Sequence, residues 1–552
     1  MEDLVIRNAR VVDGAGGAAF AADVAVNGGR ITAVGTVAGQ GKREIDAGGH
    51  VLAPGFIDIH THYDPQICWD RLATPSLEHG VTTVVMGNCS LTLAPVRPEG
   101  RHKLIKMFEK IEDIKEATFD AAVPFTWESF GDYMDHVRPG LGINVGALVG
   151  HSALRFYVMG KESQDRIATD DEIAQMCELL EQAMADGAMG LSTSYIDIDE
   201  NNRPVPSRLA DMREKIALCQ AMAKSGRGVL QTVPYFIDLE QQLANIEELG
   251  DLSLASGVTC SIAPIIYSPV APDAYKRSLE KLEEQRARGA KVYGQSMPRS
   301  FDLNIRLSET SFLLYGTPAW NALMQLPINE RIAGFADPDA RAGLVDAANG
   351  TLLMLLYTLR IGDTYSDENK PLEGRLLSEV AQEMGTTLPD AMLTIAVRDN
   401  LQTEFQLKGA IHADRNEVIK LLDNPLIHIG ASDAGAHVSQ FCGAGDTGDM
   451  IDIYVRQRGD MTLEHAVHRM TGELADAWGM AGRGYIREGY AADLVIFDPE
   501  TIARGKEQFV SDFPGEARRY VCHAQGVDTV IVNGAVVREA GAYTEARAGV
   551  FV

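Results

Sequence analysis

The chain has 552 residues, of which 45% are hydrophobic and 23% charged, and this ordinary globular composition excludes collagen-like and low-complexity proteins. Acidic residues outnumber basic ones by 77 to 50, so the net charge of −27 repels phosphate backbones and anionic membranes. We therefore expect neither nucleic acid nor a membrane as a partner.

We expect no secretory signal peptide at the start of the chain. Met1-Glu2-Asp3 places acids where a signal peptide carries Lys or Arg, and no apolar run reaches the roughly 18 residues of a membrane span. The seven cysteines are scattered and form no CxxC pair, which argues against a disulfide framework and against a four-cysteine zinc site. We expect a cytoplasmic protein.

Short alternating runs separated by turn residues occur at both ends of the chain. Ile31–Val34 is an example near the start, and Thr529–Val537, with an Asn-Gly turn inside it, is an example near the end. We expect residues 1–54 and 485–552 to pair into one small β-sandwich domain.

The central part, residues 55–484, alternates apolar strand-like runs with helical segments. This alternation is typical of βα units around a parallel sheet. Thr169-Asp170-Asp171-Glu172 is a capping box that predicts the start of one of the helices. The candidate strands are 55–60, 81–86, 143–149, 189–192, 228–233, 259–265, 291–295 and 426–429. Eight such strands close a (β/α)8 barrel of the TIM type.

Residues 301–400 are too long for a single connection between a strand and a helix. This predicted insertion contains the run Phe312–Tyr315 and Trp320, which would suit a lid or a substrate pocket, although a helical elaboration of the core fits equally well. The apolar runs 312–315 and 352–356 could also form a surface between subunits. We expect a homo-oligomer.

The sharpest motif is Gly-Phe-Ile-Asp-Ile-His-Thr-His at 55–62, an apolar strand that ends in His60 and His62. Side chains alternate along a strand, so both imidazoles point to the same side, at the end of the barrel where such folds place their sites. A pair of histidines with this spacing suits one divalent metal ion.

Two further strands deliver candidate ligands at their ends. The run 81–89 ends in Cys89, which would be a thiolate ligand beside a metal or a buried core thiol without one. Asp433 follows the last strand and faces the barrel mouth, where a carboxylate could bind metal and carry a proton. The alternative for Asp433 is an N-cap of the next helix.

With these motifs the chain resembles the amidohydrolase superfamily and, within it, the D-aminoacylase (N-acyl-D-amino-acid deacylase) group. The likeness covers nearly the whole length. Besides the entry strand at 55–62, it rests on residues 81–89, 148–160, 190–193, 204–208, 432–437 and 484–494. The resemblance implies a metal-dependent (β/α)8 barrel flanked by a small β-sandwich.

The resemblance also implies a ligand set. His60, His62 and Asp433 would hold one metal, and Cys89 would stand where D-aminoacylases place a cysteine ligand instead of a carboxylated lysine. D-aminoacylases bind a tighter zinc with that cysteine and one histidine from each of strands five and six, whereas this chain has no histidine between His151 and His412. We therefore expect one divalent ion per chain rather than two, with zinc as the expected metal.

The implied chemistry is hydrolysis of a carbon–nitrogen bond in a small-molecule substrate. Asp433, as the catalytic residue, would take a proton from the metal-activated water and pass it to the departing amine. His151 would help to stabilise the oxyanion, and the cationic groups would bind an anionic substrate. The candidate substrate-binding residues, all near predicted strand ends, are His151, Arg155, Tyr195, Arg299 and His437.

Three functions remain open on the sequence. The first is hydrolysis of a linear amide, with an N-acyl amino acid or a related small amide as substrate. The second keeps the metal chemistry but acts on a cyclic amide, lactone, carbamate or aryl amide, which the acidic chain and the aromatic insertion would suit. The third is a barrel that has lost its metal and serves as a non-catalytic binding protein, and retention of His60, His62 and Asp433 argues against it.

Overall fold

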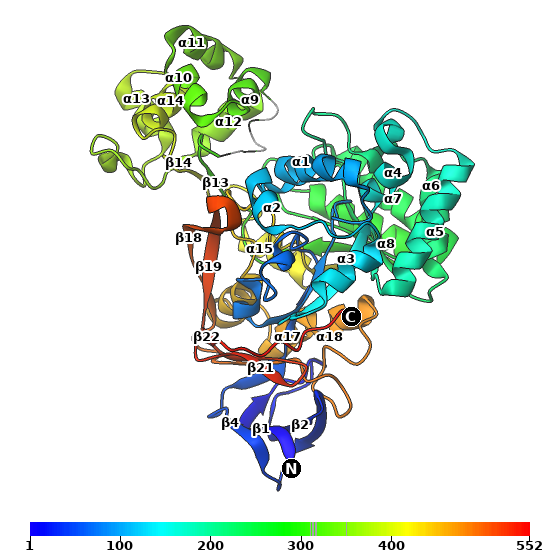
Figure 1. The fold of residues 1–552 in the computed structure, drawn as a ribbon. Coiled ribbons are helices and arrows are strands. Elements are labelled where there is room, and N and C mark those ends of the chain that lie inside the picture. The colour runs from blue at the N-terminus through cyan, green and yellow to red at the C-terminus, as the bar shows by residue number, and fades with distance from the viewer. Residues whose placement is uncertain (310, 312–313, 315–316, 349) are drawn as a thin grey trace.

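A computed structural model of the chain describes every residue except 310, 312–313, 315–316 and 349 (Figure 1). Three residues of the predicted aromatic run, Phe312, Leu313 and Tyr315, therefore lie outside the described residues. Within the described part of the chain, no helix is both long enough and apolar enough to cross a membrane.

The centre of the molecule is an eight-stranded parallel sheet in the order β16-β12-β11-β10-β9-β8-β7-β6. The strands are β6 (Phe56–Asp58), β7 (Val81–Met86), β8 (Asn144–Gly150), β9 (Gly190–Ser194), β10 (Val229–Val233), β11 (Thr259–Ile262), β12 (Val292–Ser296) and β16 (Ile427–Ile429). Each one falls on a strand expected from the sequence. All six residues of β7 are buried, as expected for a strand covered on both faces. The predicted barrel is confirmed.

The first and last barrel strands meet beyond their carboxyl ends. Thr61 and Ala434 form a parallel bridge there, with the His62 amide donating to the Ala434 carbonyl at 2.8 Å and the Asp433 amide donating to the His60 carbonyl at 3.2 Å. This contact carries the chain after β6 alongside the chain after β16. It places the predicted ligands of the first and eighth strands next to one another.

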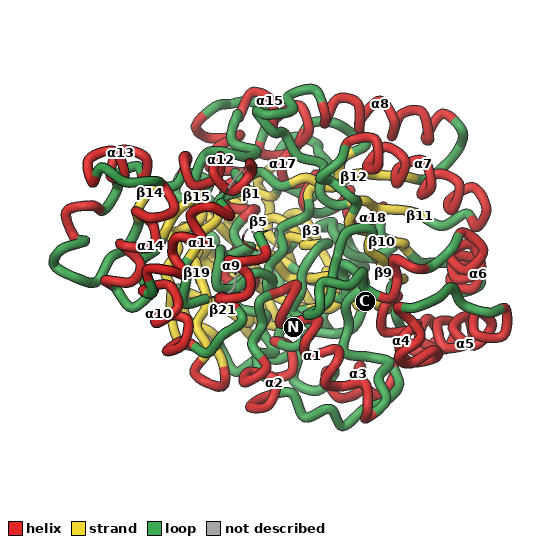
Figure 2. The backbone as a smooth tube through the Cα atoms, turned by 90° about the horizontal axis from the view of Figure 1, so that it is seen from above, coloured by secondary structure: helices red, strands yellow, loops and turns green. Residues whose placement is uncertain are grey.

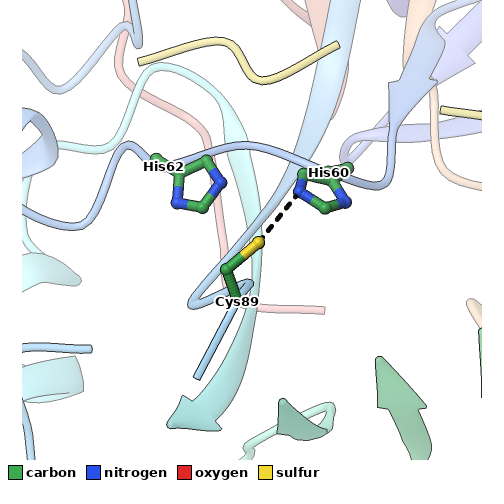
Figure 3. Close-up of side chains that lie close together, drawn as sticks. All are labelled: His60, His62 and Cys89. Carbon is green, nitrogen blue, oxygen red and sulfur yellow. Dashed lines mark hydrogen bonds between the residues drawn. The ribbon is translucent and has the colours of Figure 1, made fainter. Parts of the chain in front are cut away.

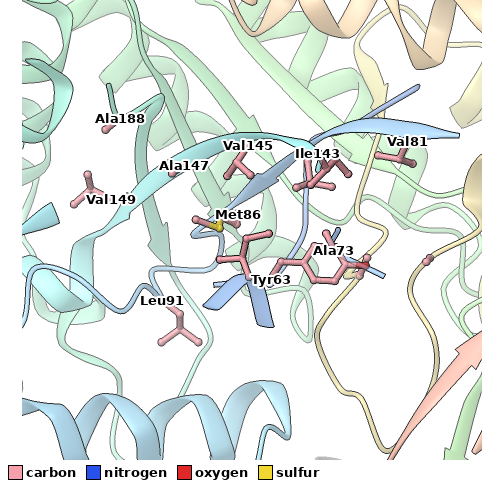
Figure 4. Packing of buried hydrophobic residues seen from close by; sticks show 14 of the residues in the cluster. Tyr63, Ala73, Val81, Met86, Leu91, Ile143, Val145, Ala147, Val149 and Ala188 are labelled. Carbon is pink, nitrogen blue, oxygen red and sulfur yellow. The ribbon is translucent and has the colours of Figure 1, made fainter. Parts of the chain in front are cut away.

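Helices cover the outside of the barrel strands (Figure 2). They include α4 (His151–Met159), α5 (Asp170–Asp186), α6 (Met212–Ala223), α7 (Leu239–Ser256), α8 (Ala274–Ala287), α15 (Arg415–Leu422) and α17 (Leu463–Met470). The Thr169 hydroxyl accepts the Glu172 amide at the start of α5, so the predicted capping box is present. Apolar side chains of neighbouring elements pack between these layers, among them Met86, Val145 and Val149 (Figure 4).

Both ends of the chain contribute to one nine-stranded sheet, in the order β22-β21-β20-β17-β5-β1-β2-β3 with β4 beside β1. Its strands are β1 (Glu2–Val11), β2 (Phe20–Asn27), β3 (Arg30–Gly35), β4 (Gly41–Asp46), β5 (Val51–Pro54), β17 (Leu494–Phe497), β20 (Val527–Val532), β21 (Ala535–Glu539) and β22 (Ala542–Tyr543). The antiparallel pair β5 and β17 joins the two ends. Because β5 leads directly into β6, this sheet anchors the strand that precedes the two histidines.

The segment between β12 and β16 forms a helical unit set apart from the barrel helices (Figure 1). It comprises β13 (Leu303–Ile305), α9 (Pro318–Met324), α10 (Ile328–Ala336), α11 (Pro338–Ala347), α12 (Gly350–Thr358), β14 (Arg360–Ile361), α13 (Leu377–Met384), α14 (Leu388–Arg398) and β15 (Phe405–Leu407). Trp320, Phe335 and Phe405 belong to its own hydrophobic core. A long hairpin, β18 (Ala503–Phe513) and β19 (Ala517–Gln525), contacts this unit through Tyr520, which bonds to Arg306 and Glu404.

Candidate metal centre

Two histidines, one cysteine and one aspartate converge where the chain leaves β6, β7 and β16. The ligand atoms of His60, His62 and Cys89 all lie within 4.8 Å of one another, and the three side chains face one another (Figure 3). Asp433 Oδ1 lies 3.1 Å from His60 Nε2 and 3.7 Å from His62 Nε2, and Cys89 Sγ lies 3.5 Å from His60 Nε2. The structure thus brings together the four residues expected as metal ligands.

The backbone after β6 explains why the two histidines share a side. Residues two apart in an extended chain point the same way, and the imidazole centroids of His60 and His62 are 5.4 Å apart. Thr61, between them, turns its hydroxyl away to donate to the Val85 carbonyl at 2.9 Å. The bridge between Thr61 and Ala434 then brings the neighbouring Asp433 to both rings.

A strained turn presents Cys89. Cys89 and Ser90 both adopt left-handed backbone conformations, with φ of 54° and 69°, which cost energy for residues other than glycine. The Gln231 side-chain oxygen accepts the Cys89 amide at 3.1 Å, and the Ser192 hydroxyl accepts the Ser90 amide at 3.0 Å. Gln231 Nε2 also lies 3.4 Å from His60 Nδ1. The strand-five side chain at this site is therefore an amide that supports Cys89 and His60.

Several carboxylates surround these ligands. Burial raises the pKa of Asp58 and of Asp197 to about 6, and burial together with neighbouring acids raises the pKa of Glu112 well above its usual range. Burial, with the charges of Asp197 and Glu112 added, also raises the pKa of the Cys89 thiol. Burial alone would raise the pKa of Asp433, but the polar contacts and charges of the two adjacent histidines hold it well below its usual range.

A divalent cation fits this donor set. Two imidazoles, a thiol and a carboxylate are the ligands that zinc and related ions take in proteins. Three buried polar atoms at the site, His62 Nδ1, Glu112 Oε2 and Asp197 Oδ2, lack a hydrogen-bond partner among the described residues. Buried acids that raise one another's pKa form the environment in which a bound cation is most favourable.

His151 and Arg155 do not join this site, in contrast to the substrate role expected for them. His151 Nε2 lies 2.8 Å from Glu214 Oε1 and its Nδ1 lies 3.2 Å from the Thr193 hydroxyl, while Arg155 pairs with the other oxygen of Glu214. Thr193 follows Ser192 on β9, so its side chain lies on the opposite face of the strand from the Ser192 hydroxyl that supports the turn. The cluster therefore lies between the barrel and helices α4 and α6.

The other three expected substrate residues have different placements. The Tyr195 hydroxyl donates to Glu248 on α7 at 2.8 Å, which directs it toward the helical layer. Arg299 donates to the Ser432 carbonyl at 2.6 Å, so it holds the segment that carries the aspartate ligand. His437 lies four residues after that ligand, and burial lowers its pKa to about 4. Of the three, His437 stays a candidate for substrate contact.

Two acidic residues that lie at the site, Asp58 and Glu112, were not predicted from the sequence. Asp58 could have been predicted, because it precedes His60 and His62 at the same two-residue spacing and so points to the same side. In the structure its carboxylate accepts a hydrogen bond from the Ser432 hydroxyl at 2.7 Å. Nothing in the sequence pointed to Glu112, because it is the last residue of a charged helix, and such a helix predicts a solvent-exposed surface. Its approach to the site depends on how that helix packs.

The chain matches known proteins over nearly its whole length. A model of the amidohydrolase family matches residues 43–538 of the chain. D-aminoacylase from Alcaligenes xylosoxydans xylosoxydans is 30% identical over 99% of this chain and 96% of its own length. N-acyl-D-aspartate deacylase from the same organism is 29% identical over 91% of this chain and 86% of its own.

Solved structures agree with the sequence comparison. A D-aminoacylase with a binuclear metal centre, described as activated by one metal and attenuated by the second, matches with a TM-score of 0.69 and 28% identity. The match covers 100% of this chain and 99% of that one. A second D-aminoacylase structure, described as defining a novel subset of amidohydrolases, matches with a TM-score of 0.67 and 28% identity over the same shares.

Proposed function

Since the chain belongs to the amidohydrolase family, as its motifs predicted, we propose that it hydrolyses the amide bond of an N-acylated amino acid with one divalent metal ion. Dependence on a divalent metal and action on a carbon–nitrogen bond are properties of the family. The observation that carries the proposal is the convergence of His60, His62, Cys89 and Asp433 on one another at the barrel mouth.

The bound ion would supply a water of lowered pKa and a Lewis acid for the substrate carbonyl. Asp433 is placed to accept and donate the proton, because its carboxylate lies against both histidine ligands and at the open end of the barrel. It would accept the proton of the attacking water and then donate it to the departing amine nitrogen. Arg299 keeps Asp433 in place through the Ser432 carbonyl.

A single zinc ion per chain is the stoichiometry we propose. The strand-five position beside Cys89 holds Gln231, whose amide is already bonded to the Cys89 amide and close to His60. Neutral amides are weak ligands for zinc compared with imidazole. The strand-six segment Thr259–Ile262 contains no histidine, so the imidazoles needed for a second site of the D-aminoacylase kind are absent from both strands.

An N-acylated amino acid carries a carboxylate, and we assign its recognition to Arg208. Arg208 Nη1 donates to the carbonyls of Ile196 at 2.9 Å and Asp197 at 3.2 Å, in the loop after β9. Its guanidinium carbon lies 6.0 Å from the ring centroid of Tyr235, in the loop after β10. Loops after barrel strands build the substrate site in this fold. Among the described residues Arg208 forms no salt bridge, although its charge acts on the neighbouring acid Asp197, and a substrate carboxylate would provide a direct partner for its guanidinium.

Replacing Arg208 by methionine tests this assignment. We expect KM for an N-acetyl amino acid to rise by about 10- to 100-fold, the loss of one charge-assisted hydrogen bond. KM for the corresponding N-acetyl amino acid amide, which lacks the carboxylate, should change little. The measurement is steady-state kinetics on the two substrates with wild type and Arg208→Met.

Arg203→Met is the matched control, because Arg203 lies in the same loop but forms an exposed ion pair with Asp165. It should leave both KM values unchanged. An equal loss on the charged and the neutral substrate in Arg208→Met would show that Arg208 only supports the loop.

A second candidate substrate class is a neutral, apolar cyclic amide or lactone. Three apolar side chains are exposed in the loops after strands five and six: Phe236, Ile237 and Val270, at 46%, 73% and 78%. An apolar rim of this kind favours uncharged substrates. Faster hydrolysis of a cyclic amide or lactone than of any acylated amino acid would select this alternative.

A further inference from the structure

A buried carboxylate lies directly behind one of the metal ligands. Glu112 is the last residue of α1 (Arg101–Glu112), and its Oε1 lies 3.1 Å from His62 Nδ1, with each side chain 2% exposed. Helix α1 belongs to the connection between β7 and β8, and Cys89 lies near the start of the same connection. One connection therefore brings both a ligand and a carboxylate to the site.

The two ring nitrogens of His62 have different surroundings. Nε2 faces the Asp433 carboxylate at 3.7 Å, and Nδ1 faces Glu112. Nδ1 and the second Glu112 oxygen, Oε2, have no aligned hydrogen-bond partner in the described part of the chain. Unpaired buried polar atoms are costly, and a small rotation of the carboxylate would pair Nδ1 with Glu112.

We propose that Glu112 is a positioning residue for the metal site. Its carboxylate accepts the Nδ1 proton of His62 and so holds His62 in the tautomer whose Nε2 lone pair is directed at the metal. A carboxylate behind a metal-bound histidine fixes ring orientation and strengthens the ligand. This inference rests on the proposed metal-dependent function and adds a residue to it.

The other histidine offers a comparison within the same site. Behind His60 stands the neutral amide of Gln231, 3.4 Å from Nδ1, whereas behind His62 stands a carboxylate. His62 is therefore the ligand with a carboxyl group behind it, and a bound cation would favour the ionised form of that group.

The position of Glu112 is fixed from a second direction. The next residue, Asp113, accepts the Ser439 amide at 3.2 Å and also bonds to the Ser439 hydroxyl. Ser439 lies in the segment that follows Asp433. The end of α1 is thus fastened to the segment that carries the eighth-strand ligand, and Glu112 is held beside the first-strand ligand.

The test compares the Co²⁺ affinity of wild type, Glu112→Gln and Glu112→Leu, measured by competition with a chelator, together with the visible spectrum of the bound Co²⁺. Glu112→Leu is expected to weaken Co²⁺ binding by about 10- to 100-fold, the range seen when partners of metal ligands are lost. Glu112→Gln keeps the volume and an acceptor oxygen but loses the charge, and we expect a smaller loss together with a changed spectrum.

Glu214→Gln is the matched control, because Glu214 is also a buried glutamate against a histidine, at 2.8 Å from His151 Nε2, but outside the metal site. Its folded protein should bind Co²⁺ as wild type does. If Glu112→Leu does not fold, Glu112→Gln decides the question. Wild-type affinity and spectrum in Glu112→Gln would overturn the inference alone, whereas a wild type that binds no Co²⁺ would overturn the proposed function as well.

Discussion

Replacing Asp433 by asparagine is expected to lower kcat by about 10²- to 10⁴-fold, the contribution of a positioned proton-transfer group. Asparagine keeps an oxygen that can face the metal and the two histidines, but it cannot accept the proton of the attacking water. The measurement is kcat on an N-acetyl amino acid with metal content determined on the same samples, so that lost chemistry is separated from lost metal.

Asp423→Asn serves as the control, because Asp423 lies just before β16 and forms an exposed pair with His465. Its kcat should equal that of wild type. An Asp433→Asn enzyme that keeps its metal and nearly full kcat would show that another group carries the proton.

Replacing Glu214 by alanine is expected to lower the free energy of unfolding by about 3 to 5 kcal/mol, the cost of breaking a buried ion pair from one side. Glu214 is the shared partner of His151 and Arg155, and all three side chains are at most 1% exposed. The change leaves a buried guanidinium without its carboxylate. Denaturant unfolding followed by circular dichroism measures the loss.

The same variant decides between two roles for the cluster. If His151 and Arg155 are structural, as their position between barrel and helices indicates, the folded Glu214→Ala protein keeps its KM. A raised KM with unchanged stability would instead restore the substrate role expected from the sequence.

The barrel could be predicted because its signal is local and repeated. Each buried strand, such as Val81–Met86, is an apolar run of strand length followed by a helical segment, and eight repeats admit one closed arrangement. The start of α5 was predictable for the same reason, since the Thr169 capping box lies within four residues. The pair His60 and His62 needed only the alternation of side chains along an extended chain.

The remaining site residues depend on packing between distant segments. His151 follows β8 at the predicted end of the barrel, but its direction is set by contact with Glu214 on another helix, and strand position alone does not encode that direction. Glu112 reaches His62 only because the end of α1 lies beside the chain that follows β6. Gln231 was recognised as a missing histidine, whereas its support of the Cys89 turn required the three-dimensional structure.

The proposed hydrolysis depends on a single metal held by residues that follow the first, second and eighth strands. Its most direct test is the metal content of protein purified without added metal, by elemental analysis of wild type and His60→Ala. We expect one divalent ion per chain in wild type and its loss in His60→Ala. Two ions per chain would contradict the single-metal site, and no metal even after incubation with Zn²⁺ or Mn²⁺ would contradict the hydrolase and favour a non-catalytic barrel.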